Sequence, residues 1–213
     1  MLIPYTAPEA PVRARTEIQK SIFIANLAPA ASMEEAEAFW DARRKEFRDA
    51  RHHCFACRIG ARQAREKSSD DGEPQGTAGH PMLRVLQMQD LTNTVLVVTR
   101  YFGGIKLGAG GLTRAYSGAA AGACREARLI RHTPHLSVRL TLPYDAVGLF
   151  EKYAEGTDIL VAERLFTDTA AFSLLVPPES WPVHSRALTD LTAGRACAET
   201  TGETYVPLPA ERK

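Results

Sequence analysis

Glycine is concentrated in one part of this 213-residue chain. Ten of the fifteen glycines lie within residues 68–122. Glycine tolerates a positive φ angle and lets another backbone or a ligand approach closely, although it weakens regular structure. The cluster therefore predicts loops of defined shape. An acidic stretch at residues 69–74 and a glycine-rich stretch at residues 103–111 flank residues 94–102, whose β-branched residues are typical of a strand.

Length and composition bound the class of protein. A chain of this length forms one large domain or two small ones, and 45% hydrophobic with 24% charged residues is an ordinary globular composition. The apolar runs are shorter than the ~20 residues that a membrane helix needs, and residues 1–15 lack the pattern of a secretory signal. Four cysteines do not predict a disulfide scaffold. We expect a reduced, cytoplasmic protein without membrane contact.

Charge is distributed unevenly along the chain. Residues 1–132 hold 19 Lys and Arg against 14 Asp and Glu, a net charge of +5. Residues 133–213 hold 7 against 11, a net charge of −4. The basic half is compatible with a polyanionic partner, although the same charge spread over 132 residues is also an ordinary solvated surface.

The first half predicts a mixed sequence of strands and helices. Residues 1–14 contain three prolines and predict an extended lead-in, and residues 17–27 predict one strand. Ser32 and Glu35 form a capping box, which predicts a helix that begins at this point. The remaining expected elements are a strand at residues 53–59, a short helix at 81–86, a strand at 94–102 and a helix at 112–127.

The pattern changes at residues 132–134, which we take as the domain boundary. Residues 136–142 alternate strictly between leucine or valine and polar residues, which indicates a half-buried strand. A helix near residues 145–155, strands near 159–166 and 170–176, a second helix and a last strand follow. This order is β-α-β-β-α-β, the ferredoxin-like arrangement. We therefore predict two domains, at residues 1–132 and 133–213.

Cys54 and Cys57 form a C-x-x-C pattern next to His52 and His53. A zinc site needs four ligands, usually from two such pairs, and Cys124 and Cys197 are isolated in the sequence. Successive side chains of a strand point to opposite faces, so Cys54 and Cys57 would face opposite ways. The spacing disfavours metal binding or redox chemistry at this position.

The glycine-rich stretch between the strand and the helix invites comparison with phosphate-binding loops, because a helix N-terminus favours an anion. It lacks the spacing of a Walker A loop and of a dinucleotide-binding fingerprint. Two interpretations of the glycines therefore remain. Their backbone N–H groups could bind an anion, or the loop could be a tight turn that needs positive φ angles. The candidate nucleic-acid or phosphate contacts are Arg100, Tyr101, Phe102, Gly103, Gly104, Lys106, Gly108, Gly110, Gly111 and Arg114.

The acidic stretch offers three carboxylates, from Asp70, Asp71 and Glu73. Such a cluster could hold Mg²⁺ against a bound phosphate, which makes Mg²⁺ the one cofactor to consider. Asp-Gly and Glu-Pro pairs are also ordinary turn formers. The rest of this motif loop consists of Gly72, Pro74, Gly76, Thr77 and Gly79. No serine, cysteine or histidine has partners that would indicate a catalytic triad, so we name no catalytic residue.

Taken together, these motifs resemble the Impact family, in its bacterial YigZ-like branch. The resemblance covers residues 15–130 and rests on the segments 69–74, 76–79, 81–83, 100–108, 110–112 and 115–116, with support from 20–25 and 53–60. It implies a two-domain α+β protein. The first domain would have the ribosomal-protein-type β-α fold of domain four of elongation factor G. The second would be ferredoxin-like, similar to domain five of that factor.

The resemblance carries over no catalytic residue. Eukaryotic Impact proteins regulate translation initiation by competing for an activator of a stress kinase. The match begins near residue 15, so we expect no counterpart of their N-terminal partner-binding domain and do not carry over the kinase role. What the resemblance implies is a connection with translation.

Our leading hypothesis is a translation-associated regulatory or binding protein that contacts RNA or the ribosome. Arg100, Lys106 and Arg114 would contact phosphates, and Tyr101 or Phe102 would stack on bases. A second hypothesis is an Mg²⁺-dependent enzyme that acts on a nucleotide or phosphorylated substrate. A third is a protein-interaction module whose acidic second domain makes the contact. Fold analogy alone does not decide among them.

Overall fold

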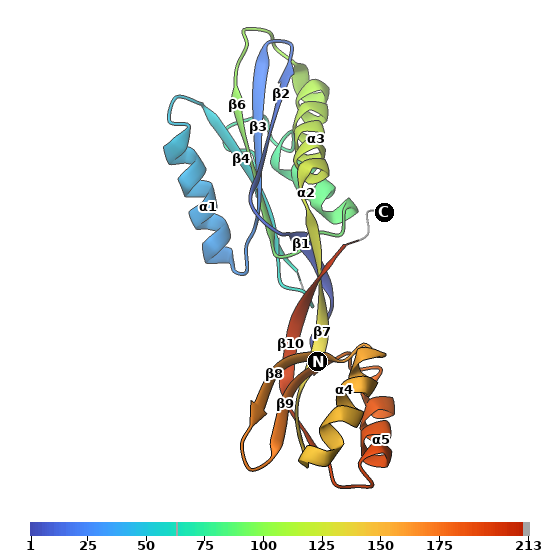
Figure 1. The fold of residues 1–213 in the computed structure, drawn as a ribbon. Coiled ribbons are helices and arrows are strands. Elements are labelled where there is room, and N and C mark those ends of the chain that lie inside the picture. Colours follow the sequence, from blue (N-terminus) through green and yellow to red (C-terminus); the bar gives the residue numbers. More distant parts are fainter. Residues whose placement is uncertain (63, 211–213) are drawn as a thin grey trace. The chain divides into compact units, whose positions relative to one another are not determined.

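The computed structural model describes residues 1–62 and 64–210. These residues form a mixed α/β fold that divides into two compact units (Figure 1). The larger unit consists of residues 4–132 with 207–210, and the smaller unit of residues 1–3 with 133–206. The chain therefore passes from one unit to the other after residues 3, 132 and 206.

A five-stranded antiparallel sheet forms the centre of the larger unit. Its order is β2-β3-β6-β4-β5, and all four neighbouring pairs are antiparallel. The strands are β2 (Val12–Ile18), β3 (Ser21–Pro29), β4 (His52–Ile59), β5 (Arg65–Ser69) and β6 (Thr94–Tyr101). The central strands are almost wholly buried because helices cover both faces of the sheet (Figure 1).

Helix α1 (Met33–Glu46) covers one face of this sheet, and α2 (Gly79–Met88) and α3 (Gly108–Glu126) cover the other. The alternation of side chains along the strands sorts them between these two cores. Phe55 and Cys57 pack on the α1 side, whereas Cys54 and Ala56 pack on the side of α2 and α3. The predicted opposite orientation of the two cysteines is confirmed.

The capping box at the start of α1 is confirmed with one change. The Glu35 N–H donates to Ser32 Oγ at 3.2 Å, while Glu35 Oε2 accepts from the N–H of Ala31 at 2.8 Å, one residue before the expected donor.

The predicted single strand at residues 17–27 was wrong, because the chain forms a hairpin. Strands β2 and β3 are joined by the two residues Gln19 and Lys20, which both have positive φ angles, 46° and 64°. Two-residue hairpin loops favour this conformation because its twist matches that of the strands. Helix α3 also begins earlier than predicted, at Gly108, so the last four residues of the glycine-rich stretch are helical.

A short ladder completes the larger unit. Strand β1 (Tyr5–Pro8) pairs antiparallel with the first four residues of β7 (Leu129–Leu142). Strand β10 (Cys197–Pro209) also pairs with β7, and the N–H of Ala210 donates to the carbonyl of Leu129 at 3.1 Å.

The smaller unit has the β-α-β-β-α-β order that the sequence predicts. The elements after β7 are a 3₁₀ turn (Tyr144–Ala146), α4 (Val147–Glu155), β8 (Leu160–Phe166), β9 (Ala170–Val176), α5 (Trp181–Leu191) and β10. The strand order is β10-β7-β9-β8, with β8 at the edge. In the core of this unit the rings of Phe150 and Phe172 pack edge to face, with 4.7 Å between their centroids.

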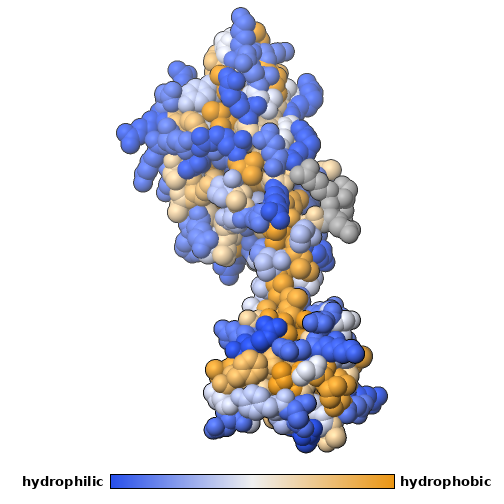
Figure 2. Space-filling view, viewed as in Figure 1, coloured by the Kyte–Doolittle hydropathy of each residue, from blue (hydrophilic) through white to orange (hydrophobic). Residues whose placement is uncertain are grey.

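None of the helices in the described parts of the chain has the length and apolar character that crossing a membrane requires. Figure 2 shows mainly hydrophilic side chains on the visible face of the larger unit.

Candidate functional site

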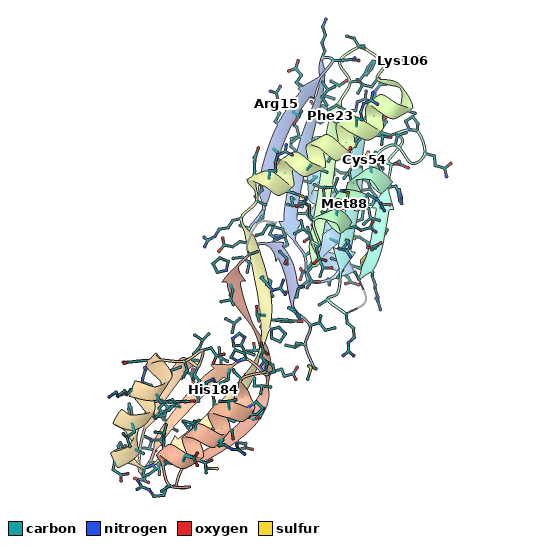
Figure 3. The ribbon with its side chains drawn as sticks, turned by 90° about the vertical axis from the view of Figure 1, so that its right-hand side faces the viewer. Arg15, Phe23, Cys54, Met88, Lys106 and His184 are labelled. Carbon is teal, nitrogen blue, oxygen red and sulfur yellow. The ribbon has the colours of Figure 1, made fainter. Side chains whose placement is uncertain are left out.

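The glycine-rich loop meets the β2–β3 turn at one end of the larger unit, which we call the tip. The tip consists of the Gln19-Lys20 turn, the loop at residues 102–107 and the start of α3 at residues 108–114. It lies at the top of Figure 1, where β2 turns into β3 and where β6 leads into α3. Figure 3 shows Lys106 at the same end.

Gly103 joins the loop to the hairpin. A Cβ atom at this position would lie 2.0 Å from the carbonyl carbon of Lys20, so only glycine fits. The N–H of Gly103 donates to Ser21 Oγ at 3.2 Å. Gly104 and Gly108 have positive φ angles of 86° and 69°, which glycine adopts without steric cost. These glycines fix the path of the loop against the β2–β3 turn.

The carboxylate of Asp70 organises the acidic loop. Its two oxygens accept hydrogen bonds from the N–H groups of Gly76, Ala78 and Gly79 at 2.8–2.9 Å. Partial burial opposes ionisation, but these three donors outweigh it and lower the pKa of Asp70. The loop is closed further by Thr77, whose hydroxyl donates to the carbonyl of Pro74 at 2.6 Å.

Asp71 and two glycines anchor the same loop to its surroundings. Asp71 Oδ1 accepts from Arg44 Nη2 at 2.6 Å, and its Oδ2 accepts from the N–H of His53 at 2.7 Å. Gly72 has a φ angle of 86°. A Cβ atom on Gly79 would lie 2.7 Å from the backbone of Ser69. The residues of the motif are therefore needed for the shape of the loop.

Glu73 connects the acidic loop to the glycine-rich segment. Its side chain is buried, and Oε1 accepts from Arg100 Nη1 and from the Tyr116 hydroxyl, each at 2.8 Å. Burial is the main cause that raises the pKa of the Tyr116 hydroxyl, so this group stays protonated and donates. Glu73 thus ties the acidic loop to β6 and α3, the elements on either side of the glycine-rich loop. A nucleotide site would need the two loops close together in this way, but the Glu73 carboxylate already accepts hydrogen bonds from protein groups.

The three acidic residues therefore have partners already. Mg²⁺ takes oxygen ligands in near-octahedral geometry, and the carboxylates of Asp70, Asp71 and Glu73 each accept hydrogen bonds or ion pairs from the protein. Within residues 1–62 and 64–210, no three His, Cys, Asp or Glu side chains come together in a way that could hold a metal ion. We do not build a metal site from this loop.

The C-x-x-C cysteines are buried and separated. Cys54 Sγ donates to the carbonyl of Asp70 at 3.0 Å. Cys57 lies 3.9 Å from the sulfur of Met33 and, because it is buried, its pKa is raised to about 11. Thiols with raised pKa values are poor nucleophiles and poor metal ligands at neutral pH.

The sequence-predicted phosphate contacts differ in exposure. Arg100 is only 6% exposed and is paired with Glu73, so the structure places it beneath the surface. The hydroxyl of Tyr101 donates to Asp49 at 2.8 Å. Phe102 is 56% exposed, and Lys106 and Arg114 are exposed at the tip. The exposed Lys20 was missed by sequence reasoning, because its position depends on the unpredicted hairpin.

The N-terminus of α3 lies among these exposed cations. Its N-cap residue, Leu107, supplies no side-chain hydrogen bond, and the first turn contains no acidic residue. The first N–H groups of a helix have no partner within the helix and carry partial positive charge. A Cβ atom on Gly110 would lie 3.6 Å from Arg114 Nη1, so the guanidinium of Arg114 lies over this first turn. The tip therefore combines the partial positive charge of the helix N-terminus with exposed cationic side chains.

These features define a mixed α/β protein of two units, in which the glycine-rich loop and the β2–β3 turn build a basic tip and Glu73 ties the acidic loop to β6 and α3. Two family models match the chain: the Impact N-terminal domain over residues 19–124, and a domain of unknown function, DUF1949, over residues 140–195. The chain belongs to the Impact family, since it is 39% identical to the Escherichia coli IMPACT family member YigZ over 88% of this chain and 93% of that protein.

A eukaryotic relative matches only part of the chain. The Saccharomyces cerevisiae protein IMPACT homolog is 37% identical over 93 residues, which are 41% of this chain and 35% of the yeast protein. A crystal structure described as that of a hypothetical protein is 35% identical, covers 94% of this chain and 98% of its own, and superposes with a TM-score of 0.62. This similarity supports the two-unit architecture.

Proposed function

We propose that this protein is a translation-associated binding protein that contacts RNA or the ribosome through the tip. One observation carries the proposal: Lys20, Lys106 and Arg114 are exposed around the uncapped N-terminus of α3, on backbone segments that Gly103 holds together. Cations and backbone N–H groups that converge in this way are suited to phosphate groups. Membership of the Impact family supports the connection with translation.

Phe102 extends this surface beyond charge. Its ring is 56% exposed, and the neighbouring Ile105 is 42% exposed. The guanidinium of Arg100 lies 5.6 Å from the centre of the Phe102 ring, which supports the ring from the protein side. An exposed aromatic ring beside phosphate-binding cations provides a stacking platform for an unpaired base. In this proposal Arg100 and Tyr101 shape the tip but do not contact the partner.

The architecture gives the proposal a second support. By analogy, the larger unit would correspond to domain four of elongation factor G and the smaller unit, with its β-α-β-β-α-β order, to domain five. Such an analogy concerns the fold and does not establish a function. It nevertheless directs the first experiment to ribosomes rather than to short oligonucleotides.

Co-sedimentation with ribosomes and with RNA tests the proposal. The wild type and Lys106→Ala/Arg114→Ala are compared at low and moderate salt, with Arg84→Ala/Lys152→Ala as a control that removes the same charge elsewhere on the surface. We expect salt-sensitive binding by the wild type and the control. The tip variant should bind more weakly, and its affinity should depend less on salt because fewer phosphate contacts are made.

Equal binding by the tip variant and the control would overturn the tip as the contact. Absence of binding by the wild type would overturn the RNA and ribosome proposal altogether. In that case, thermal-shift titration with Mg²⁺ plus nucleotide tests the phosphorylated-substrate hypothesis.

One observation favours a protein partner for the smaller unit. Strand β8 is the edge strand of its sheet, and Leu160, Leu165 and Phe166 on it are 44–54% exposed. Edge strands with exposed apolar side chains are ready to pair with another chain. We propose this edge as a second contact, tested by nuclease-resistant co-purification of a single protein with the wild type and its loss in Leu165→Asp. Retention by that variant would contradict it.

A further inference from the structure

A cleft of about 740 Å³ lies within the larger unit, away from the motif loops. The β1–β7 ladder forms its floor. Leu129 and Arg131 lie on the same face of β7, and Thr6 of β1 is directly opposite Arg131. Leu208 adds the edge of β10, and the ends of α2 and α3 form the walls. Figure 3 shows Met88, which lines the cleft, at the end of α2.

This cleft is distinct from the tip because the two lie at opposite ends of α3. The tip surrounds Gly108, whereas Ala121, Cys124 and Arg125 of the last turns line the cleft. At 1.5 Å per residue, the two ends of this 19-residue helix are about 27 Å apart.

The cleft is lined by apolar side chains and by two arginines. Met88, Ala121, Leu129 and Leu208 supply apolar surface. The side chains of Arg125 and Arg131 form no hydrogen bond or ion pair within the part of the chain that the structure describes, and both residues are exposed. Guanidinium groups recognise carboxylate and phosphate through paired hydrogen bonds.

Asp90 limits the charge of an occupant. It is the one carboxylate among the cleft-lining residues that the structure describes, so it would repel further negative charge on a ligand. The ends of α2 and α3 also carry partial negative charge. These groups favour a small anion over a polyanion such as RNA.

We propose that this cleft binds a small molecule with one anionic head group on an apolar body. The head would lie between Arg125 and Arg131, and the body would cover the apolar floor. The volume agrees with this class, because small-molecule sites measure roughly 300–1,000 Å³. A carboxylate or a phosphate head group could each pair with the two guanidinium groups.

Calorimetric titration of the whole protein with monomeric decanoate tests the proposal, with decyl phosphate and decanol in parallel. We expect decanoate or decyl phosphate to bind, the stronger of the two identifying the head group, and decanol to bind at least about tenfold more weakly. Arg125→Ala and Arg131→Ala should each weaken binding of the anion by about tenfold. Arg84→Ala, an exposed arginine of α2 outside the cleft, serves as the matched control.

Ala121→Trp provides an independent test, because a large side chain at this position fills the cleft. It should abolish binding of both anions while thermal unfolding shows a folded protein. The two arginine variants change only exposed side chains and decide the question if Ala121→Trp does not fold. Decanol that binds as tightly as decanoate, anion binding that the arginine variants leave unchanged, or no binding of either anion overturns the proposal.

Discussion

At the scale of single residues, Glu73 is the point at which the motif loops are joined. The side chain of Glu73 is 3% exposed and the side chain of its partner Arg100 is 7% exposed, with 2.8 Å between Oε1 and Nη1. Arg100 also lies 5.6 Å from the centre of the Phe23 ring. A buried ion pair is stabilising only relative to the unpaired charge, so its members depend on each other.

Glu73→Gln should therefore destabilise the protein strongly. Loss of one partner leaves Arg100 with an uncompensated buried charge, which costs about 3–5 kcal/mol in the free energy of unfolding. Urea unfolding of the variant and the wild type measures this loss. Glu46→Gln removes the charge from surface ion pairs with Arg13 and Arg43 and should cost less than about 1 kcal/mol. Similar losses in the two variants would show that the burial of Glu73 has no energetic consequence.

Asp70 should make stability depend on pH. Its pKa in the folded protein is lower than the ordinary value of 3.8, so its carboxylate stabilises the fold fully above that value. This stabilisation is lost as the pH falls through the lower folded-state pKa. Asp70→Asn should thus lower the free energy of unfolding at about pH 7 and differ less from wild type at about pH 3.

Urea unfolding at the two pH values measures this difference. Asp41→Asn, at an exposed position of α1, is the control and should show the same small difference at both. A difference between Asp70→Asn and wild type that does not change with pH would contradict the assignment of the three N–H donors to an ionised carboxylate.

The sequence indicated these residues but not their partners. The acidic and glycine-rich motifs marked the loops, and turn chemistry explains Gly72 and Pro74. The pairing of Glu73 with Arg100 joins residues 27 positions apart, and no local pattern specifies it. For this reason sequence reasoning treated Arg100 as a ligand contact, whereas the fold buries it.

At the scale of elements, the hairpin and the loop that leads into α3 depend on contact at Gly103. Gly103→Ala should destabilise the protein, because its Cβ would lie 2.0 Å from the backbone of Lys20. Gly118→Ala is the matched control on α3, where a Cβ meets nothing within 4 Å. It should stabilise the protein by about 0.5–1 kcal/mol, since alanine favours a helix interior. Thermal unfolding measures both, and equal shifts would refute the contact.

Element boundaries were predicted well where hydrophobic periodicity decided them. The strand at β6 follows from its run of β-branched residues, and the first strand of the smaller unit follows from strict alternation over residues 136–142. The β2–β3 turn was missed because Gln19 and Lys20 are not typical of residues with positive φ angles. Four residues at the start of α3 were assigned to a loop because three of them are glycines, which disfavour helix.

At the scale of the whole molecule, each unit has its own core. Phe172→Ala removes a ring that is 1% exposed from the core of the smaller unit, which costs about 3–5 kcal/mol. Hydrogen exchange should then accelerate in residues 133–206 and stay unchanged in α2 and α3. Phe23→Ala, in the core of the larger unit, should produce the reverse pattern. Acceleration throughout the chain in both variants would mean that the units unfold together.

The three passages of the chain between the units have a consequence for dissecting the protein. A fragment ending at residue 132 would lack residues 207–210, including Ala210, whose N–H donates to the carbonyl of Leu129. It would thereby also lack one border of the cleft in the larger unit. A fragment beginning at residue 133 would lack Ile3, whose carbonyl accepts from the Tyr205 hydroxyl at 3.0 Å. Neither unit can be isolated by a single cut, so an excised unit needs a designed peptide link to its missing segment.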